Sequence, residues 1–117
     1  MKNVNVKKLL SQILTRLHPE QMFKVVQLST TFTATASSTA DTSFSAYTTS
    51  YPATNWRAIA LAGWDLDGTG IGNARIYAVN LANGGTSSAT VHYQIGNVAS
   101  TTYSWTLRPF VTYAKIK

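Results

Sequence analysis

The apolar residues of the chain follow two different periods, and the first is helical. Between Asn3 and Leu17 they step by four, three and four residues, with Leu9 and Leu14 widening the stripe formed by Val6, Leu10, Ile13 and Leu17. This spacing predicts an amphipathic helix that Pro19 ends. A helix of about 14 residues is marginal alone in water. We therefore expect the stripe to be an oligomer or docking interface that packs on the chain's own β domain or on copies of itself.

After residue 22 the apolar residues alternate with polar ones, as in strands. Alternation is strict at Ala89, Val91, Tyr93 and Ile95, and the turn signal Asn83-Gly84-Gly85 comes shortly before. The run 56–65 is apolar on both parities, which predicts a strand covered on both faces. Pro109 stands where the apolar parity of the last run changes, which indicates a bulge or an edge position. Between two aromatic stretches, the Ser/Thr/Ala-rich run 34–50 is interpreted as a surface hairpin.

These patterns predict six to seven short strands. The fold class expected is mainly β: an antiparallel β-sandwich, jelly-roll-like, preceded by a short N-terminal α-helix. The domains expected are a helical anchor or oligomerisation segment over 1–21 and a β-sandwich domain over 22–117.

Composition excludes several classes of chemistry. The 117 residues include no cysteine, so disulfides and thiolate metal sites are absent, and charged residues make up only 12% of the chain. Of the net charge of +6, +4 lies in residues 1–24. Such a basic segment suits an acidic partner, whereas the scattered arginines of the β region predict no specific nucleic-acid binding. No apolar run approaches the ~18 residues of a membrane span, and the stretch after Met1 is interrupted by Gln12, Thr15 and Arg16, so we expect neither membrane insertion nor export by a signal peptide.

Asp65 and Asp67, followed by Gly68, are weak candidates for a calcium site. An EF-type loop that begins at Asp65 requires an acid at position twelve, where Ile76 stands. The alternative is a glycine-rich turn with the aspartates bonding local backbone. We expect no metal and no cofactor. No catalytic residue is predicted either, since His18 and His92 have no nucleophile or carboxylate motif beside them, and the protein is expected not to be an enzyme.

Aromatic residues next to hydroxyls provide the candidate binding site. Tyr47, Tyr51 and Trp56 flank Thr48, Thr49 and Ser50. Flat aromatic rings beside hydroxyl groups suit sugars, which have an apolar face and many hydroxyls. The alternative is that these aromatic rings close one end of the β core.

Two runs of the sequence resemble a known class of proteins. Phe44-Ser45-Ala46-Tyr47 and residues 56–70, WRAIALAGWDLDGTG, are similar to the β domain of small tail and fibre proteins of tailed bacteriophages and prophages. In that class a short N-terminal helix leads into a Thr/Ser-rich strand and a β-rich end. The resemblance implies a homotrimer that projects from the virion and contacts the host surface or another virion protein, and it brings no catalytic residue.

The function expected is therefore that of a virion structural protein, made in the host bacterial cytoplasm and carried on the extracellular particle. A trimeric tail fibre or baseplate tip would attach to the host surface, with glycan binding, and dock on other virion proteins through its N-terminal helix. One alternative is a capsid-bound head fibre or decoration protein. Another is a stand-alone carbohydrate-binding module.

Overall fold

The computed structural model describes residues 22–47, 50–83 and 88–116. The predicted helix and its interface residues Val6, Leu10, Ile13 and Leu17 lie outside these ranges. Within them the chain is mainly β, as expected, and forms two antiparallel sheets. The elements are β1 (Phe23–Gln27), β2 (Thr30–Ala34), β3 (Ser38–Tyr47), β4 (Trp56–Asp67), the short 3-10 helix η1 (Ile71–Asn73), β5 (Ala74–Asn83), β6 (Ser88–Asn97) and β7 (Tyr103–Lys115).

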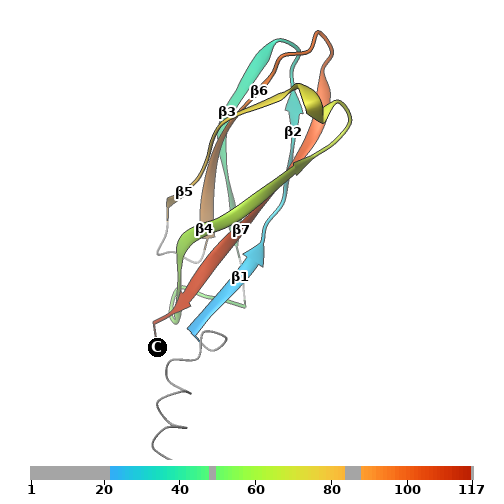
Figure 1. Ribbon diagram of the computed structural model, residues 1–117. Coiled ribbons are helices and arrows are strands. Elements are labelled where there is room, and N and C mark those ends of the chain that lie inside the picture. Colours follow the sequence, from blue (N-terminus) through green and yellow to red (C-terminus); the bar gives the residue numbers. More distant parts are fainter. Residues whose placement is uncertain (1–21, 48–49, 84–87, 117) are drawn as a thin grey trace, which may run out of the picture.

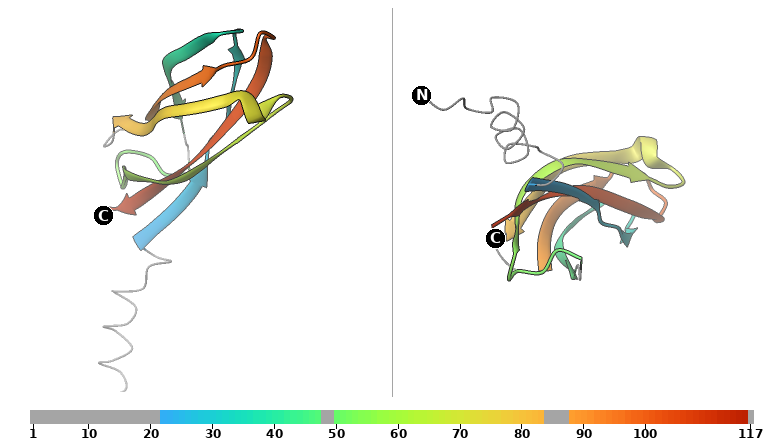
Figure 2. Two further views of the ribbon diagram at one scale, coloured as in Figure 1. Left: turned by 45° about the horizontal axis from the view of Figure 1, so that its top comes forward. Right: turned by 90° about the horizontal axis from the view of Figure 1, so that it is seen from below.

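Each sheet is built around one long central strand. In sheet A, β7 pairs with β4 on one side and with β1 and β2, placed end to end, on the other. In sheet B, β6 lies between β3 and β5. Figure 2 shows the strands of sheet A lying over those of sheet B. The start of β1 and the end of β7 lie at one end of the domain, and the turns after β2 and β6 lie at the other (Figure 1).

The buried residues of the two sheets meet in two clusters between them. Near the end where β7 finishes, Val111 and Tyr113 of β7 pack with Ala89 and Val91 of β6. Toward the opposite end the cluster contains Ala34, Tyr93, Ile95, Trp105 and Leu107. Trp105 is fully buried. Burying roughly 200 Å² of an indole contributes about 5 kcal/mol at 25 cal/mol per Å², as an upper estimate. The alternation predicted over Ala89, Val91, Tyr93 and Ile95 is confirmed.

Pro109 corrects one prediction. It lies in the central strand of sheet A, fully buried, and continues an unbroken alternation of inward residues from Trp105 to Tyr113. Its carbonyl accepts a hydrogen bond from Leu28 N at 2.8 Å, at the break between β1 and β2. Because the N–H and C=O of a strand residue point to the same neighbour, the N–H that proline lacks would face this break. A central proline is therefore tolerated without a bulge in β7 or an edge position.

Two further expectations differ from the structure. The strand β4 is not covered on both faces by the described residues, since Ile59 and Trp64 are 51% and 41% exposed. The register of β4 against β7 shifts after Ala58 and again after Leu61, because a bulge inserts one extra residue at each point. The apolar residues fall on both parities because each bulge changes the parity that faces the core. The Ser/Thr/Ala-rich run is not a hairpin, because β2 and β3 belong to different sheets and β3 forms an edge of sheet B.

The loop between β4 and β5 closes one end of the core. The indole Nε1 of Trp105 donates a 2.8 Å hydrogen bond to the carbonyl of Thr69. Gly70 has a φ of 75°, and a Cβ at this position would overlap the Tyr103 ring. The backbone of Gly70 therefore approaches the aromatic ring as only glycine allows.

We predict that Gly70→Ala destabilises the fold by about 2–3 kcal/mol, since it combines an unfavourable φ with overlap of a half-buried ring. Thermal unfolding followed by circular dichroism would measure this as a lower melting temperature. Gly72→Ala is the matched control, because a Cβ at Gly72 meets nothing within 4 Å. Equal melting temperatures for the two variants would contradict this account of the loop.

Candidate functional site

The outer face of sheet B is polar over its whole length. Strand β3 places Thr39, Asp41, Ser43 and Ser45 beside Gly96, Gln94, His92 and Thr90 of β6, according to their register. Cross-strand bonds join the two strands: Asp41 Oδ1 lies 2.7 Å from His92 Nε2, and Ser45 Oγ lies 2.7 Å from Thr90 Oγ1. This face therefore offers hydroxyl, amide and charged groups to solvent.

Tyr77 stands out on this polar face. It is the extra residue of a register shift between Ile76 and Ala78 in β5, and it is 62% exposed. Regular alternation would place Tyr77 on the same face as Val79, which packs against the core. The bulge instead turns the tyrosine outward.

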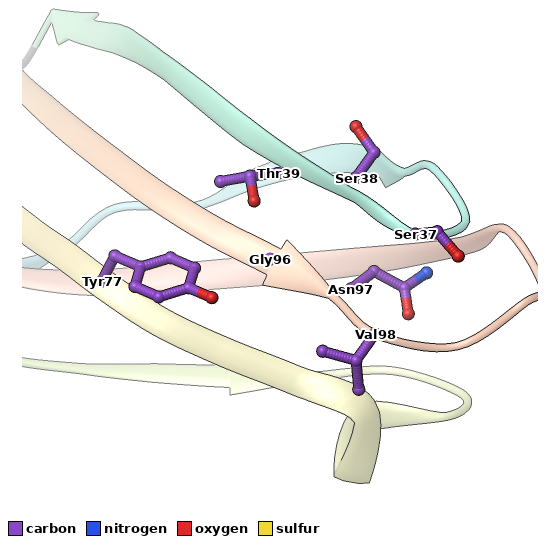
Figure 3. A pocket seen from close by; sticks show the side chains of 7 residues that line it. All are labelled: Ser37, Ser38, Thr39, Tyr77, Gly96, Asn97 and Val98. Carbon is purple, nitrogen blue, oxygen red and sulfur yellow. The ribbon is translucent and has the colours of Figure 1, made fainter.

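Gly96 creates the space that Tyr77 occupies. A Cβ at Gly96 would stand 3.0 Å from Tyr77 Cε2 and 3.3 Å from Thr39 Oγ1. The phenol ring therefore lies directly over the backbone of β6, with its hydroxyl directed toward Asn97 and Val98 (Figure 3). One side of the ring rests on the protein, and more than half of the residue remains open to solvent.

An open cavity of about 240 Å³ lies beside this ring, lined by Ser37, Ser38, Thr39, Tyr77, Gly96, Asn97 and Val98. Hydroxyl side chains from the start of β3 form one wall, and Tyr77 and Val98 form apolar parts of the lining (Figure 3). Most of its lining comes from the start of β3 and the end of β6. These parts of the two strands lie at the end of the domain away from the start of β1 and the end of β7 (Figure 1).

Three loops that surround the cavity are fixed to one another. Ser37 N donates to the carbonyl of Ala99 at 2.9 Å, and Val98 N donates to the carbonyl of Asn73 at 3.1 Å. The buried amide of Asn97 donates to the carbonyls of Ala34 and Thr101 and accepts from Ala99 N, each at 2.9 Å. Asn97 thus has a structural role, and the exposed side chains left to contact a ligand include those of Ser38, Thr39 and Tyr77.

The predicted aromatic site lies elsewhere and faces the core. Tyr51 stacks on the buried Tyr113 with a centroid distance of 5.6 Å and meets the edge of Trp56 at 4.9 Å. Both Tyr51 and Trp56 are part-buried and pack against the core cluster. This arrangement matches the alternative that these aromatic rings close one end of the β core. The side chain of Tyr47 lies outside what the structure describes.

Asp65 and Asp67 face Arg108 across the β4–β7 pair. Arg108 Nη1 lies 2.6 Å from Asp67 Oδ2 and 3.4 Å from Asp65 Oδ2. The hydrogen bond to Asp67, and then the charge of Asp67, raise the pKa of Arg108 above its usual value. Within residues 22–47, 50–83 and 88–116, no three His, Asp or Glu side chains gather where they would share a metal ion. In the same ranges no helix is both long and apolar enough to cross a membrane.

The sequence pattern missed Tyr77 and Gly96 as partners, because the bulge that brings them together depends on the pairing of β5 with β6. No protein-family model, curated protein or solved structure matches the chain. A function is therefore inferred from the hydroxyl, amide and charged groups and the exposed tyrosine on the outer face of sheet B.

We predict that millimolar calcium leaves the melting temperature unchanged, because the two carboxylates of strand β4 already face Arg108 and no third His, Asp or Glu among the described residues joins them. Thermal unfolding in calcium and in a chelator would measure this. A calcium-dependent rise that disappears in Asp65→Asn would contradict the prediction and restore the calcium hypothesis.

Proposed function

We propose that this chain is a structural protein of a bacteriophage particle that attaches to the host cell by binding surface glycans. The observation that carries the proposal is the exposed Tyr77 ring over Gly96, beside an open cavity with hydroxyl groups in its lining. We further propose a trimeric tail fibre or baseplate tip, with the protein acting by binding rather than by catalysis.

A sugar fits this site in three respects. Its apolar face can stack on the exposed phenol ring, and its hydroxyls can exchange hydrogen bonds with Ser38 and Thr39. The fixed loops keep these groups in place before binding, so little conformational entropy is lost. Nucleic acid fits less well, since Arg75 donates to the carbonyls of Gly72 and Ala74 and the described residues place no row of cations beside the tyrosine on this face.

The two sheets support a sandwich of jelly-roll type as the finer description of the fold. The chain passes from one sheet to the other after β2, β3, β4 and β6, and only β5 and β6 are successive neighbours in one sheet. Repeated crossing between two antiparallel sheets is the pattern of a jelly roll, here without the full eight strands.

The placement of the cavity supports a role at the tip of a projecting protein. Residues 1–21 precede β1, which begins at the end of the domain opposite the cavity (Figure 1). If this basic segment docks on other virion proteins, the cavity points away from the particle. Several copies on one particle would raise weak glycan affinity by avidity, by about 10²–10⁴.

We predict that Tyr77→Ala weakens glycan binding at least about fivefold, since stacking on an aromatic ring contributes roughly 1 kcal/mol or more. A screen of bacterial surface polysaccharides would first identify a ligand for the full chain, and calorimetry would then compare the variants. Tyr77→Phe should retain most binding, because it preserves the ring. Trp64→Ala is the control, as it removes an exposed aromatic residue from β4 in the other sheet.

Two results would contradict the proposal. One is the absence of any polysaccharide that binds the full chain, and the other is binding that Tyr77→Ala does not weaken. Binding by a chain that stays monomeric would keep the site but favour the stand-alone carbohydrate-binding module over the virion fibre.

A further inference from the structure

The outer face of sheet A is apolar in the half nearest the start of β1. Because Val111 and Tyr113 of β7 point inward, their neighbours in the same strand point outward, and the strands on either side follow this register. We call this surface the apolar face of sheet A; it comprises Phe23, Val25, Ala60, Gly63, Phe110, Thr112 and Ala114, and Gln27, which lies beside Phe110 on the register, is the polar residue at its corner.

The side chains of this face are most exposed on the edge strand β1. Phe23 and Val25 of β1 are 41% and 59% exposed. None of the seven residues is charged, and the nearest charges on the register are Arg57 at one border and the Arg108–Asp65 pair at the other. An uncharged, apolar edge of this kind readily pairs with another protein surface. The outer face of sheet B, with Asp41, His92 and Arg75, has the opposite character.

The extent of the face and the chain that precedes it indicate what covers it. Three strands about 4.8 Å apart and five residues at about 3.4 Å each give a surface of about 14 by 17 Å. A stable interface uses about 800 Å² per partner, so this face alone is too small. Residues 1–21 end at Gln21, so that only Met22 separates them from Phe23. Their apolar stripe, from Val6 to Leu17, has the spacing of a helical seam between like helices but spans only two heptads.

We propose that the apolar face of sheet A is an interface between copies of this chain, continuous with the stripe of Val6, Leu10, Ile13 and Leu17. In the sequence the stripe ends at Leu17 and the sheet face begins at Phe23, so two apolar stretches that are each too short alone are separated by only five residues. In a closed assembly every copy uses the same face, so both surfaces are covered in all subunits. This inference rests on the trimer of the proposed function and names the surface that holds it together.

The first experiment is the solution mass of the full chain by light scattering. Wild type should have the mass of three chains, and Val25→Asp should shift it to one chain at the same concentration, because the aspartate would bury a charge between copies. Leu10→Asp should have the same effect. Ser43→Asp is the matched control, since it adds the same charge at an exposed position on the outer face of sheet B. Circular dichroism would verify that Val25→Asp retains the β signal of wild type.

A second experiment identifies the occupant and uses the absence of cysteine in the chain. Under oxidation Val25→Cys should join two chains through a disulfide, seen at the mass of two chains on a non-reducing gel, whereas Ser43→Cys should not. The double variant Ile13→Cys, Val25→Cys tests whether the chain's own first residues cover the face, by closing a disulfide within one chain.

A monomeric wild type would overturn the inference, as would a trimer that Val25→Asp leaves intact or a disulfide that forms only within one chain. Failure here is distinguishable from failure of the glycan site. Loss of assembly leaves the Tyr77 site intact in each monomer, and loss of glycan binding in Tyr77→Ala leaves the trimer intact.

Discussion

The unbroken alternation of β7 determines both the core and the surfaces of this domain. From Trp105 to Tyr113 every second residue is buried, and these residues supply both core clusters. The alternation passes through Pro109 because the chain on that side breaks between β1 and β2, where no hydrogen-bond donor is required of residue 109. If the parity changed there, Phe110 and Thr112 would face the core and Val111 and Tyr113 would leave it. The break in the neighbouring strand thus fixes which side of sheet A is apolar on the outside.

Bulges have the complementary effect on the other strands. In β4 the register shifts near Ile59 and Ala62, and in β5 it shifts at Tyr77. A bulge adds one residue to one strand, so the residues beyond it exchange faces relative to a regular strand. In β5 this transfers one large aromatic residue from the inner to the outer face, where Gly96 leaves space for it. The candidate site therefore arises from an irregularity in pairing together with the absence of a side chain on the adjacent strand.

These two effects explain how far the sequence predicts the molecule. Strand β6 follows from the strict alternation of apolar residues, and its pairing with β5 follows from the turn signal Asn83-Gly84-Gly85. Both signals are local, because burial of one face of a strand alone determines which residues along it are apolar. Three predictions are wrong: the bulge or edge position at Pro109, the cover of β4 on both faces, and the hairpin at 34–50. Each of them depends on which strands are neighbours in a sheet. Asp65 and Asp67 look like ligands in sequence, but the register places Arg108 opposite them. The outward position of Tyr77 could not be predicted, because a bulge leaves no mark in a period-two pattern.

The residues on the outer faces are the ones that the core does not determine. An outward position of either sheet can be polar without loss of core packing, and sheet B uses this freedom for hydroxyls, an Asp–His pair and the exposed Tyr77. Sheet A has apolar residues at the equivalent positions of β1 and β7, although exposed apolar strands favour unwanted association. The solvated fold requires neither the apolar groups on one sheet nor the open ring over Gly96 on the other. The two proposals would account for both, with the apolar face meeting an identical apolar surface and the polar face meeting a ligand that is itself rich in hydroxyls.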